Sequence, residues 1–512
     1  MIKNFKWLLL VSLTFVACNS DDEPFVDPNS TDGTPLTAGT ADFSKYVALG
    51  DSFAAGFSDG ALFKTGQSNS YPNIMATQFA LVGSGDFKTP FMSDEIGGFS
   101  IGGVQIAQFG PRLYLDNSTN PPTPRAVIGI SGTEISAQIQ GPFNNLGIPG
   151  AKAIHLAFSG YASANPYFGR MASSASATVL EDALSQNPTF FSLWIGGNDV
   201  LGYATSGGDG SNPITPTATF DAAYNNLTTQ LVSGGRKGVV ANLPYINTLP
   251  YFTAVPHNPL TASALGQGNQ AVGVATINAL NAQLYGPLKQ ALTAFGAGDR
   301  IELLSTTQAN PVLIKDESLT NLSAQLTAAF TPTLGAANAA FYGNVFGQAR
   351  QAKATDLVLL PTRSVIASAP SASESGLGFA PPAPLNVFGV TYPLQDKHIL
   401  IPSEIQEIAT ATDAYNVTIQ SAATNNGLAF VDAKALMTQL VGAGISANNY
   451  TMTATYVTGG TFSLDGIHPS PRGYALIANK FLEAINETYG SNFKGVNVGL
   501  YRILYPMNPA NF

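Results

Sequence analysis

The sequence is poor in cysteine, in charge and in long apolar runs. Its single cysteine, Cys18, excludes an intramolecular disulfide. Charged residues make up 11% of the 512 residues against 45% hydrophobic ones, which is too apolar for a disordered protein. No apolar run is long enough to cross a bilayer. We therefore expect a soluble chain that forms a core.

Clusters of Lys or Arg are also missing, and the formal net charge is −9. Proteins that bind the phosphates of nucleic acid need a basic surface, so nucleic acid is not an expected partner. No spacing of His, Cys and Asp suggests a metal site, and we expect no cofactor. The length fits several domains, or one enzyme core with large loop insertions.

The N-terminal segment resembles a bacterial lipoprotein signal. Lys3 and Lys6 precede a short, mostly apolar stretch, residues 7–17, which ends at Cys18. We expect residues 1–18 to be a signal peptide, with Cys18 as the lipidated residue. A plain signal peptide with an unmodified cysteine is the alternative.

An acidic cluster at residues 20–23 follows the cysteine, and residues 24–40 are rich in Pro, Thr, Asp and Gly without hydrophobic periodicity. This composition predicts a flexible linker over residues 19–40. The acidic cluster resembles the surface-export signal of Bacteroidetes lipoproteins, or else it is part of a solvated linker. The expected location is the outer membrane or cell surface of a Gram-negative bacterium, with a lipid anchor at Cys18.

Three separate segments carry candidate functional residues after short apolar runs or in glycine turns. The run 45–49 leads into Gly-Asp-Ser, where glycines let the chain turn sharply at the hydroxyl of Ser52. Gly150 ends a turn that can present a backbone N–H to a reacting carbonyl. The run 189–195 precedes Asn198, whose neutral amide can stabilise an oxyanion. Each fragment alone also fits an ordinary turn.

A fourth segment holds an Asp and a His three residues apart, Asp465 and His468, in a loop with Gly and Pro before an expected helix over 472–485. The carboxylate can orient the imidazole and stabilise the imidazolium that forms when the ring takes a serine proton. An Asp that caps a turn beside a surface histidine is the alternative. The other histidines are expected to be structural or at the surface: His155, His257 and His398.

The four segments, in this order, resemble the SGNH family of hydrolases, also called GDSL esterases and lipases, over residues 45 to about 485. Agreement of all four by chance is below about one in a hundred. The resemblance implies a serine nucleophile, an oxyanion hole and an Asp–His pair that completes a triad. The implied catalytic residues are Ser52, Asp465 and His468, and the implied oxyanion hole is formed by Ser52, Gly150 and Asn198.

Two features depart from the family pattern. Phe53 stands where the family's short name has Leu, which changes packing behind the turn but no reacting atom. The intervals after Ser52 and after Asn198 are longer than in small family members. Insertions therefore lie there, and they can cover or reshape the site.

The alternation of short strands and helices predicts an α/β fold with a parallel sheet and helices on both faces. The resemblance implies a three-layer α/β/α, flavodoxin-like SGNH hydrolase fold with about five strands and large insertions. Ligands bind beyond the carboxyl ends of such strands, where Ser52 and Asn198 both fall. The expected strands are 46–49, one before Gly150, 190–195, 239–243 and 428–431; expected helices include 220–231 and 405–419.

We expect one hydrolase domain over 41–490, with an inserted lobe or lid at about 305–400 and a C-terminal tail, 491–512, packed on the domain. The last strand has two interpretations, because residues 277–304 form a second helix-and-strand pair. We prefer the strand that ends at residue 431, since it immediately precedes the loop with the Asp and the His.

The expected function is that of a serine hydrolase that cleaves carboxylic esters through an acyl-enzyme intermediate. The apolar composition and the large insertion favour a lipase or carboxylesterase with a hydrophobic acyl pocket. A surface-anchored lipoprotein can equally be a carbohydrate acetylesterase that acts on polysaccharides. The alternative of another class is a non-catalytic surface lipoprotein that binds glycans or peptides, against which the intact set of five reacting positions argues.

Overall fold

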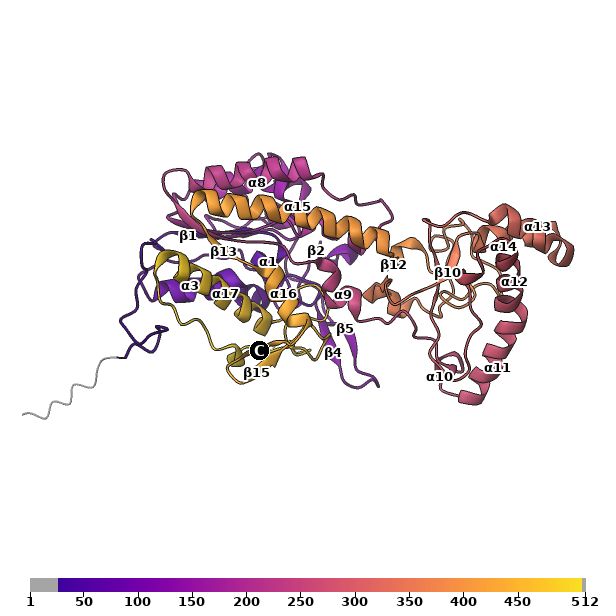
Figure 1. Cartoon of the computed structure of the whole chain (residues 1–512). Helices are drawn as coiled ribbons and strands as arrows, with labels where there is room; N and C mark the ends of the chain where they lie inside the picture. Colours follow the sequence, from indigo (N-terminus) through magenta and orange to yellow (C-terminus); the bar gives the residue numbers. More distant parts are fainter. Residues whose placement is uncertain (1–25, 509–512) are drawn as a thin grey trace, which may run out of the picture.

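The computed structural model describes residues 26–508, and its centre is a five-stranded sheet (Figure 1). The strand order is β13-β8-β7-β1-β6, and each neighbouring pair is parallel. Parallel sheets of this kind are covered on both faces and have nearly continuous apolar strands. The strands are β1 (Tyr46–Gly50), β6 (Asn145–Gly147), β7 (Phe190–Trp194), β8 (Lys237–Ala241) and β13 (Ala429–Val431).

Long helices cover both faces of the sheet (Figure 1). Helices α8 (Thr217–Val232) and α15 (Pro402–Asn426) pack together on one face. Helices α3 (Tyr71–Ala80) and α17 (Pro471–Tyr489) pack together on the other. The predicted three-layer α/β/α, flavodoxin-like architecture is confirmed.

Four predicted strands agree with β1, β7, β8 and β13 to within two residues at either end, and the strand expected before Gly150, which was predicted without bounds, corresponds to β6. The ambiguity over the last strand is also resolved. Residues 429–431 pair with β8, whereas residues 301–304 belong to no strand. The preferred interpretation was therefore correct.

A second hydrophobic core lies beside the sheet and forms a separate lobe (Figure 1). Its buried side chains extend from Val255 to Ile401, so the lobe begins well before residue 305, where we expected it. The buried apolar side chains of the second helix-and-strand pair expected over residues 277–304 pack into this lobe. The lobe's main helices are α10 (Ala262–Leu265), α11 (Gln270–Leu280), α12 (Gly286–Ala294), α13 (Ser323–Leu334) and α14 (Ala336–Phe346).

Shorter helices and strands complete the fold. The helices near the carboxyl edge of the sheet are α1 (Ser52–Ala55), α7 (Asn198–Thr205), α9 (Pro250–Thr253) and α16 (Ala433–Val441). The remaining strands form antiparallel pairs: β2 (Ser100–Ile101) with β3 (Val104–Gln105), β4 (Leu113–Asp116) with β5 (Thr123–Ala126), β9 (Leu313–Lys315) with β10 (Ala349–Gln351), β11 (Leu357–Val358) with β12 (Ile399–Leu400), and β14 (Ile445–Ala447) with β15 (Tyr450–Met452).

The two ends of the described chain are joined to each other and to the domain. The N–H of Thr31 donates to the carbonyl of Asn492 at 2.9 Å, and the N–H of Thr37 donates to the side chain of Asn492 at 2.9 Å. Residues 31–40, expected as part of an unpacked linker, therefore lie against the domain. The predicted signal peptide, Cys18 and the acidic cluster lie outside the described residues. No helix within residues 26–508 is long and apolar enough to span a membrane.

Candidate active site

Ser52 lies at the carboxyl end of β1, where the strand turns directly into α1. Asp51 caps this helix, because its Oδ1 accepts the N–H of Phe53 at 3.0 Å. Gly50 is required at the turn, since a Cβ there would come within 2.6 Å of the carbonyl oxygen of Trp194. The turn places the hydroxyl of Ser52 at the edge of the sheet, with the residue 6% exposed.

His468 links Ser52 to Asp465 through a chain of short contacts. The Nε2 atom of His468 lies 2.9 Å from Oγ of Ser52, and Nδ1 lies 2.9 Å from Oδ2 of Asp465. The other carboxylate oxygen, Oδ1, accepts the N–H groups of Ile467 and His468 at 2.9 and 2.8 Å. The loop thus fixes the carboxylate, the carboxylate orients the ring, and the ring faces the hydroxyl.

Charge and hydrogen bonding keep Asp465 ionised. Burial raises the pKa of this carboxyl, but the charge of His468 and the hydrogen bonds from His468 and Ile467 outweigh it and lower the pKa to about 2. Asp465 is therefore a carboxylate at any pH near neutrality. A fixed negative charge at Nδ1 stabilises an imidazolium, which is what a histidine becomes when it accepts a proton.

Asn198 is the first residue of α7, immediately after β7, and it holds the loop that follows Gly150. Its Nδ2 donates to the carbonyl of Ala151 at 3.0 Å. The neighbouring Asp199 accepts the N–H of Ala153 at 2.9 Å through Oδ2. Two consecutive side chains of one strand-to-helix turn thereby position the loop in which Gly150 lies, with φ of +80°.

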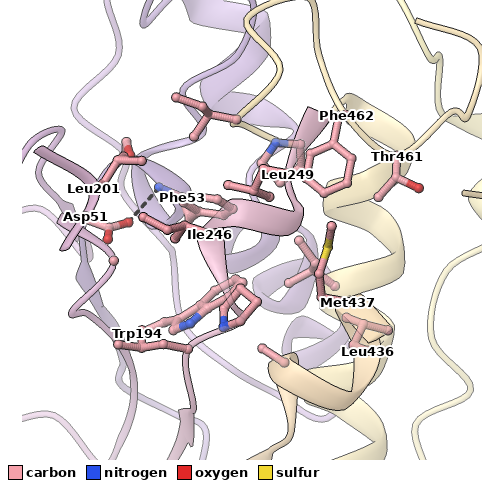
Figure 2. Close-up of a pocket in the computed structure, with 18 of the residues that line it drawn as sticks. Asp51, Phe53, Trp194, Leu201, Ile246, Leu249, Leu436, Met437, Thr461 and Phe462 are labelled. Atoms are coloured by element: carbon pink, nitrogen blue, oxygen red, sulfur yellow. Dashed lines mark hydrogen bonds between the residues drawn. The ribbon is translucent and has the colours of Figure 1, made fainter. Parts of the chain in front are cut away.

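Ser52 is one of the residues that line an apolar pocket. Figure 2 shows this pocket. Asn198 lies in its wall, so the serine and the predicted oxyanion amide share one space. The walls come from the hydrolase core alone, with no lining residue between 255 and 401. The side chains labelled in Figure 2 include Phe53, Trp194, Leu201, Ile246, Leu249, Leu436, Met437 and Phe462.

Sequence reasoning missed that α16 and the segment after β8 form this pocket. Both follow strands at the carboxyl edge of the sheet, and that position was the one available signal. Phe53, the departure from the family pattern, also lines the pocket, and its ring centroid lies 5.5 Å from that of His468. It therefore contributes to the site itself and not merely to packing behind the turn.

The inserted lobe contacts the loop that carries Asp465 and His468. The position that a Cβ on Gly466 would take lies 3.1 Å from Cδ2 of Leu360, a residue of the lobe. The carbonyl of Gly466 also accepts the N–H of Tyr251 at 2.9 Å. Leu360 of the lobe and Tyr251 of the hydrolase core thus both lie against this loop.

The other histidines lie apart from this arrangement. Nδ1 of His155 accepts the N–H of Lys152, and Nδ1 of His398 accepts the N–H of Gln395, each at 3.1 Å. Burial, together with the charge of Lys397, lowers the pKa of His398 to about 4. Within residues 26–508, no group of three or more His, Cys, Asp or Glu side chains is placed to hold a metal ion.

Comparison with family models gives a match to GDSL-like Lipase/Acylhydrolase over residues 336–481. The matched stretch contains β13, α16, Asp465 and His468, and most of α17. Over these residues the chain is similar to this family. The five-stranded parallel sheet with helices on both faces agrees with the fold that this similarity implies, and the match supports, in general terms, a hydrolase of the ester type. Comparison with curated proteins finds no match.

Proposed function

We propose that the protein hydrolyses carboxylic esters through an acyl-enzyme formed on Ser52. The observation that carries this proposal is the 2.9 Å separation between Nε2 of His468 and Oγ of Ser52, with Asp465 at the other ring nitrogen. His468 takes the hydroxyl proton as Oγ attacks the ester carbonyl carbon, and Asp465 holds the ring in the tautomer with hydrogen on Nδ1. His468 then gives the proton to the departing alcohol.

The negative charge on the carbonyl oxygen needs donors that are already in place. Ser52 is the first residue of α1, so its N–H has no acceptor within that helix. An Asn amide has two N–H donors, and Asn198 uses one on Ala151. The N–H groups of Ser52 and Gly150 and the second amide hydrogen of Asn198 would form the oxyanion hole.

Hydrolysis of the acyl-enzyme needs water and no cofactor. His468, neutral again once the alcohol has left, removes a proton from a water molecule as it attacks the acyl carbon. The second tetrahedral intermediate uses the same donors, and Ser52 recovers its proton from His468 as the acid is released. Every step thus runs through the same three side chains.

The apolar pocket favours an acyl group with a hydrocarbon chain. Its walls are formed by aliphatic and aromatic side chains such as Leu249, Met437 and Phe462. An acetyl group would leave most of this surface uncovered. Each buried methylene stabilises a complex by about 0.8 kcal/mol, so kcat/KM should rise up to about fourfold per methylene until the pocket is full. We therefore propose a carboxylesterase or lipase.

Nitrophenyl esters from acetate to palmitate, together with acetylated xylan, test this proposal. We expect kcat/KM to rise from acetate toward longer chains and then fall, and Ser52→Ala to abolish turnover of every ester. A preference for acetate and for xylan would contradict the lipase or carboxylesterase proposal and favour a carbohydrate acetylesterase. No turnover of any ester by the folded protein would favour a non-catalytic binding role.

We also propose that the enzyme is a lipoprotein of the outer membrane or cell surface, anchored at Cys18. The support is the sequence of residues 1–23, with its short apolar stretch before the one cysteine and its acidic cluster. Metabolic labelling with an alkyne fatty acid in a Gram-negative host should modify the protein but not Cys18→Ser. Equal labelling of both would contradict the anchor.

A further inference from the structure

A tight turn follows the nucleophile segment. Ser58 and Ala61 exchange two backbone hydrogen bonds of 3.1 Å, and the two residues between them, Asp59 and Gly60, have φ of +52° and +80°. Positive φ at both central residues defines a type I′ turn, for which Asp-Gly is a favoured pair. Such turns usually point into solvent, but Asp59 is only 1% exposed.

The turn is buried because it is bonded to the loop that carries Asp465 and His468. The N–H of Asp59 donates to Oγ of Ser463 at 2.9 Å, and its Oδ1 accepts the N–H of Leu464 at 2.8 Å. Oγ of Ser58 donates to the carbonyl of Pro469 at 3.0 Å. The turn therefore holds both ends of the loop.

One hydrogen bond of this turn is made directly to the carboxylate of Asp465. The N–H of Gly60 donates to Oδ2 of Asp465 at 2.9 Å, and this is the same oxygen that faces Nδ1 of His468. The position of the Asp465 carboxylate is thus shared between its own loop and the turn after Ser52. A shift of the turn would move the carboxylate relative to the imidazole.

The Asp59 carboxyl is costly to bury. Its Oδ2 has no hydrogen-bond partner among residues 26–508. Burial, with a smaller contribution from the charge of Asp465, raises the pKa of Asp59 to about 7 against the opposing effects of the Leu464 N–H and Arg112. A buried polar atom without a partner destabilises a fold, so its presence here calls for a role other than stability.

We propose that Asp59 is a positioning residue, which holds the Asp465–His468 loop in line with Ser52 through the turn that follows the nucleophile. The inference rests on the proposed ester hydrolysis. It adds a residue outside the five predicted from the sequence, and it explains how the nucleophile segment and a loop some 400 residues later keep a fixed separation.

Asp59→Gly is the sharpest test, because glycine adopts φ of +52° without strain and the variant loses only the side chain. Asn448→Gly is a matched control. Asn448 has φ of +50° in the turn between β14 and β15, and its Oδ1 accepts the N–H of Val498 at 3.1 Å. Asp59→Asn is the conservative variant, since an amide oxygen can still accept the Leu464 N–H.

We expect Asp59→Gly to lower kcat on the order of tenfold to a hundredfold with KM changed less than about twofold, because misplacement of the triad slows chemistry more than binding. Asp59→Asn should recover kcat to within about threefold of the parent, and Asn448→Gly should leave kcat unchanged. If Asp59→Gly does not fold, Ser463→Ala removes the acceptor of the Asp59 N–H and should lower kcat several-fold.

Parent-like kcat in Asp59→Gly, or in Ser463→Ala when that variant has to be used, would overturn the positioning role. Equal losses of kcat in Asp59→Gly and Asn448→Gly would do the same, as would an Asp59→Asn variant no better than Asp59→Gly. Failure of the proposed function looks different, because the unmodified protein would then turn over no ester at all.

Discussion

The side-chain amide of Asn198 donates to the carbonyl oxygen of Ala151, 3.0 Å away. This bond fixes one amide hydrogen and the rotation of the side chain, so the direction of the second hydrogen is set before a substrate arrives. A donor that needs no reorganisation stabilises a developing negative charge more than one that must turn. The loop after Gly150 and the proposed oxyanion donor on α7 are thereby positioned by the same contact.

Asn198→Asp should lower kcat by about a hundredfold to a thousandfold. The side chain keeps its shape, but a carboxylate has no hydrogen to donate and repels both the Ala151 carbonyl and an oxyanion. Steady-state hydrolysis of a nitrophenyl ester would measure the loss, with circular dichroism to verify the fold. A variant within threefold of the parent would show that Asn198 does not contact the oxyanion.

Asp465→Asn should lower kcat on the order of ten thousandfold, as in other hydrolases with this triad. The amide would donate to Nδ1 of His468, the ring would carry its hydrogen on Nε2, and it could no longer accept the proton of Ser52. Kinetics at neutral pH are decisive, because Asp465, with a pKa of about 2, is ionised there in the parent. A loss of less than tenfold would contradict the role of the carboxylate.

Asp51 gives the protein a pH-dependent stability of its own. Burial, with a smaller contribution from the charge of Asp199, raises the pKa of this carboxyl from 3.8 to about 7, and the N–H of Phe53 and the charge of His468 oppose this rise only in part. Between pH 3.8 and about pH 7, Asp51 therefore keeps its proton in the folded protein but has lost it in the unfolded chain. Stability therefore falls as pH rises, by up to about 1.4 kcal/mol per pH unit from this group, and levels off above the folded pKa.

Asp51→Asn replaces the titrating carboxyl with an amide that does not titrate, while the amide oxygen can still accept the Phe53 N–H. The melting temperature of the variant minus that of the parent should therefore increase from pH 4 to pH 7 and stay constant above it. Differential scanning calorimetry at several pH values in one ionic strength measures this difference. A difference that does not change with pH would mean that Asp51 is ionised in the folded protein.

Met437→Trp should shorten the acyl chains that the enzyme accepts. Met437 lines the pocket from α16 (Figure 2), and an indole there would fill space that a long chain needs. Activity on acetate should be retained while activity on palmitate falls at least tenfold. Val441→Trp is the control on the same helix, because Val441 is 53% exposed and does not line the pocket. An unchanged chain-length profile in Met437→Trp would place the acyl chain elsewhere.

The strands and the Ser52, Asp465 and His468 cluster could be predicted because their signals are local. A β-branched or aromatic run such as 190–194 indicates a buried strand wherever it pairs. Gly-Asp-Ser after a strand and an Asp three residues before a His each carry their geometry in a few residues. The structure joins them because parallel strands end at one edge of the sheet.

The lobe boundary and the pocket wall could not be predicted, because they depend on contacts between segments that are distant in the sequence. The apolar face of residues 277–292 looks the same whether it packs on the central sheet or in a second core, and only the partners decide. On α16, likewise, Met437 lines the pocket whereas the equally apolar Val441 is exposed to solvent. The buried Asp59 has the sequence of a surface turn, and its role depends on a loop distant in the chain.

Covalent labelling with a fluorophosphonate examines the activation of Ser52 itself, because the reagent reacts with a serine only where a base and an oxyanion hole activate it. We expect one adduct per chain, located on Ser52 by peptide mass spectrometry, absent in Ser52→Ala and at least a hundredfold slower to form in His468→Ala. A folded protein that remains unlabelled, or that is labelled equally well after Ser52→Ala, would contradict this expectation.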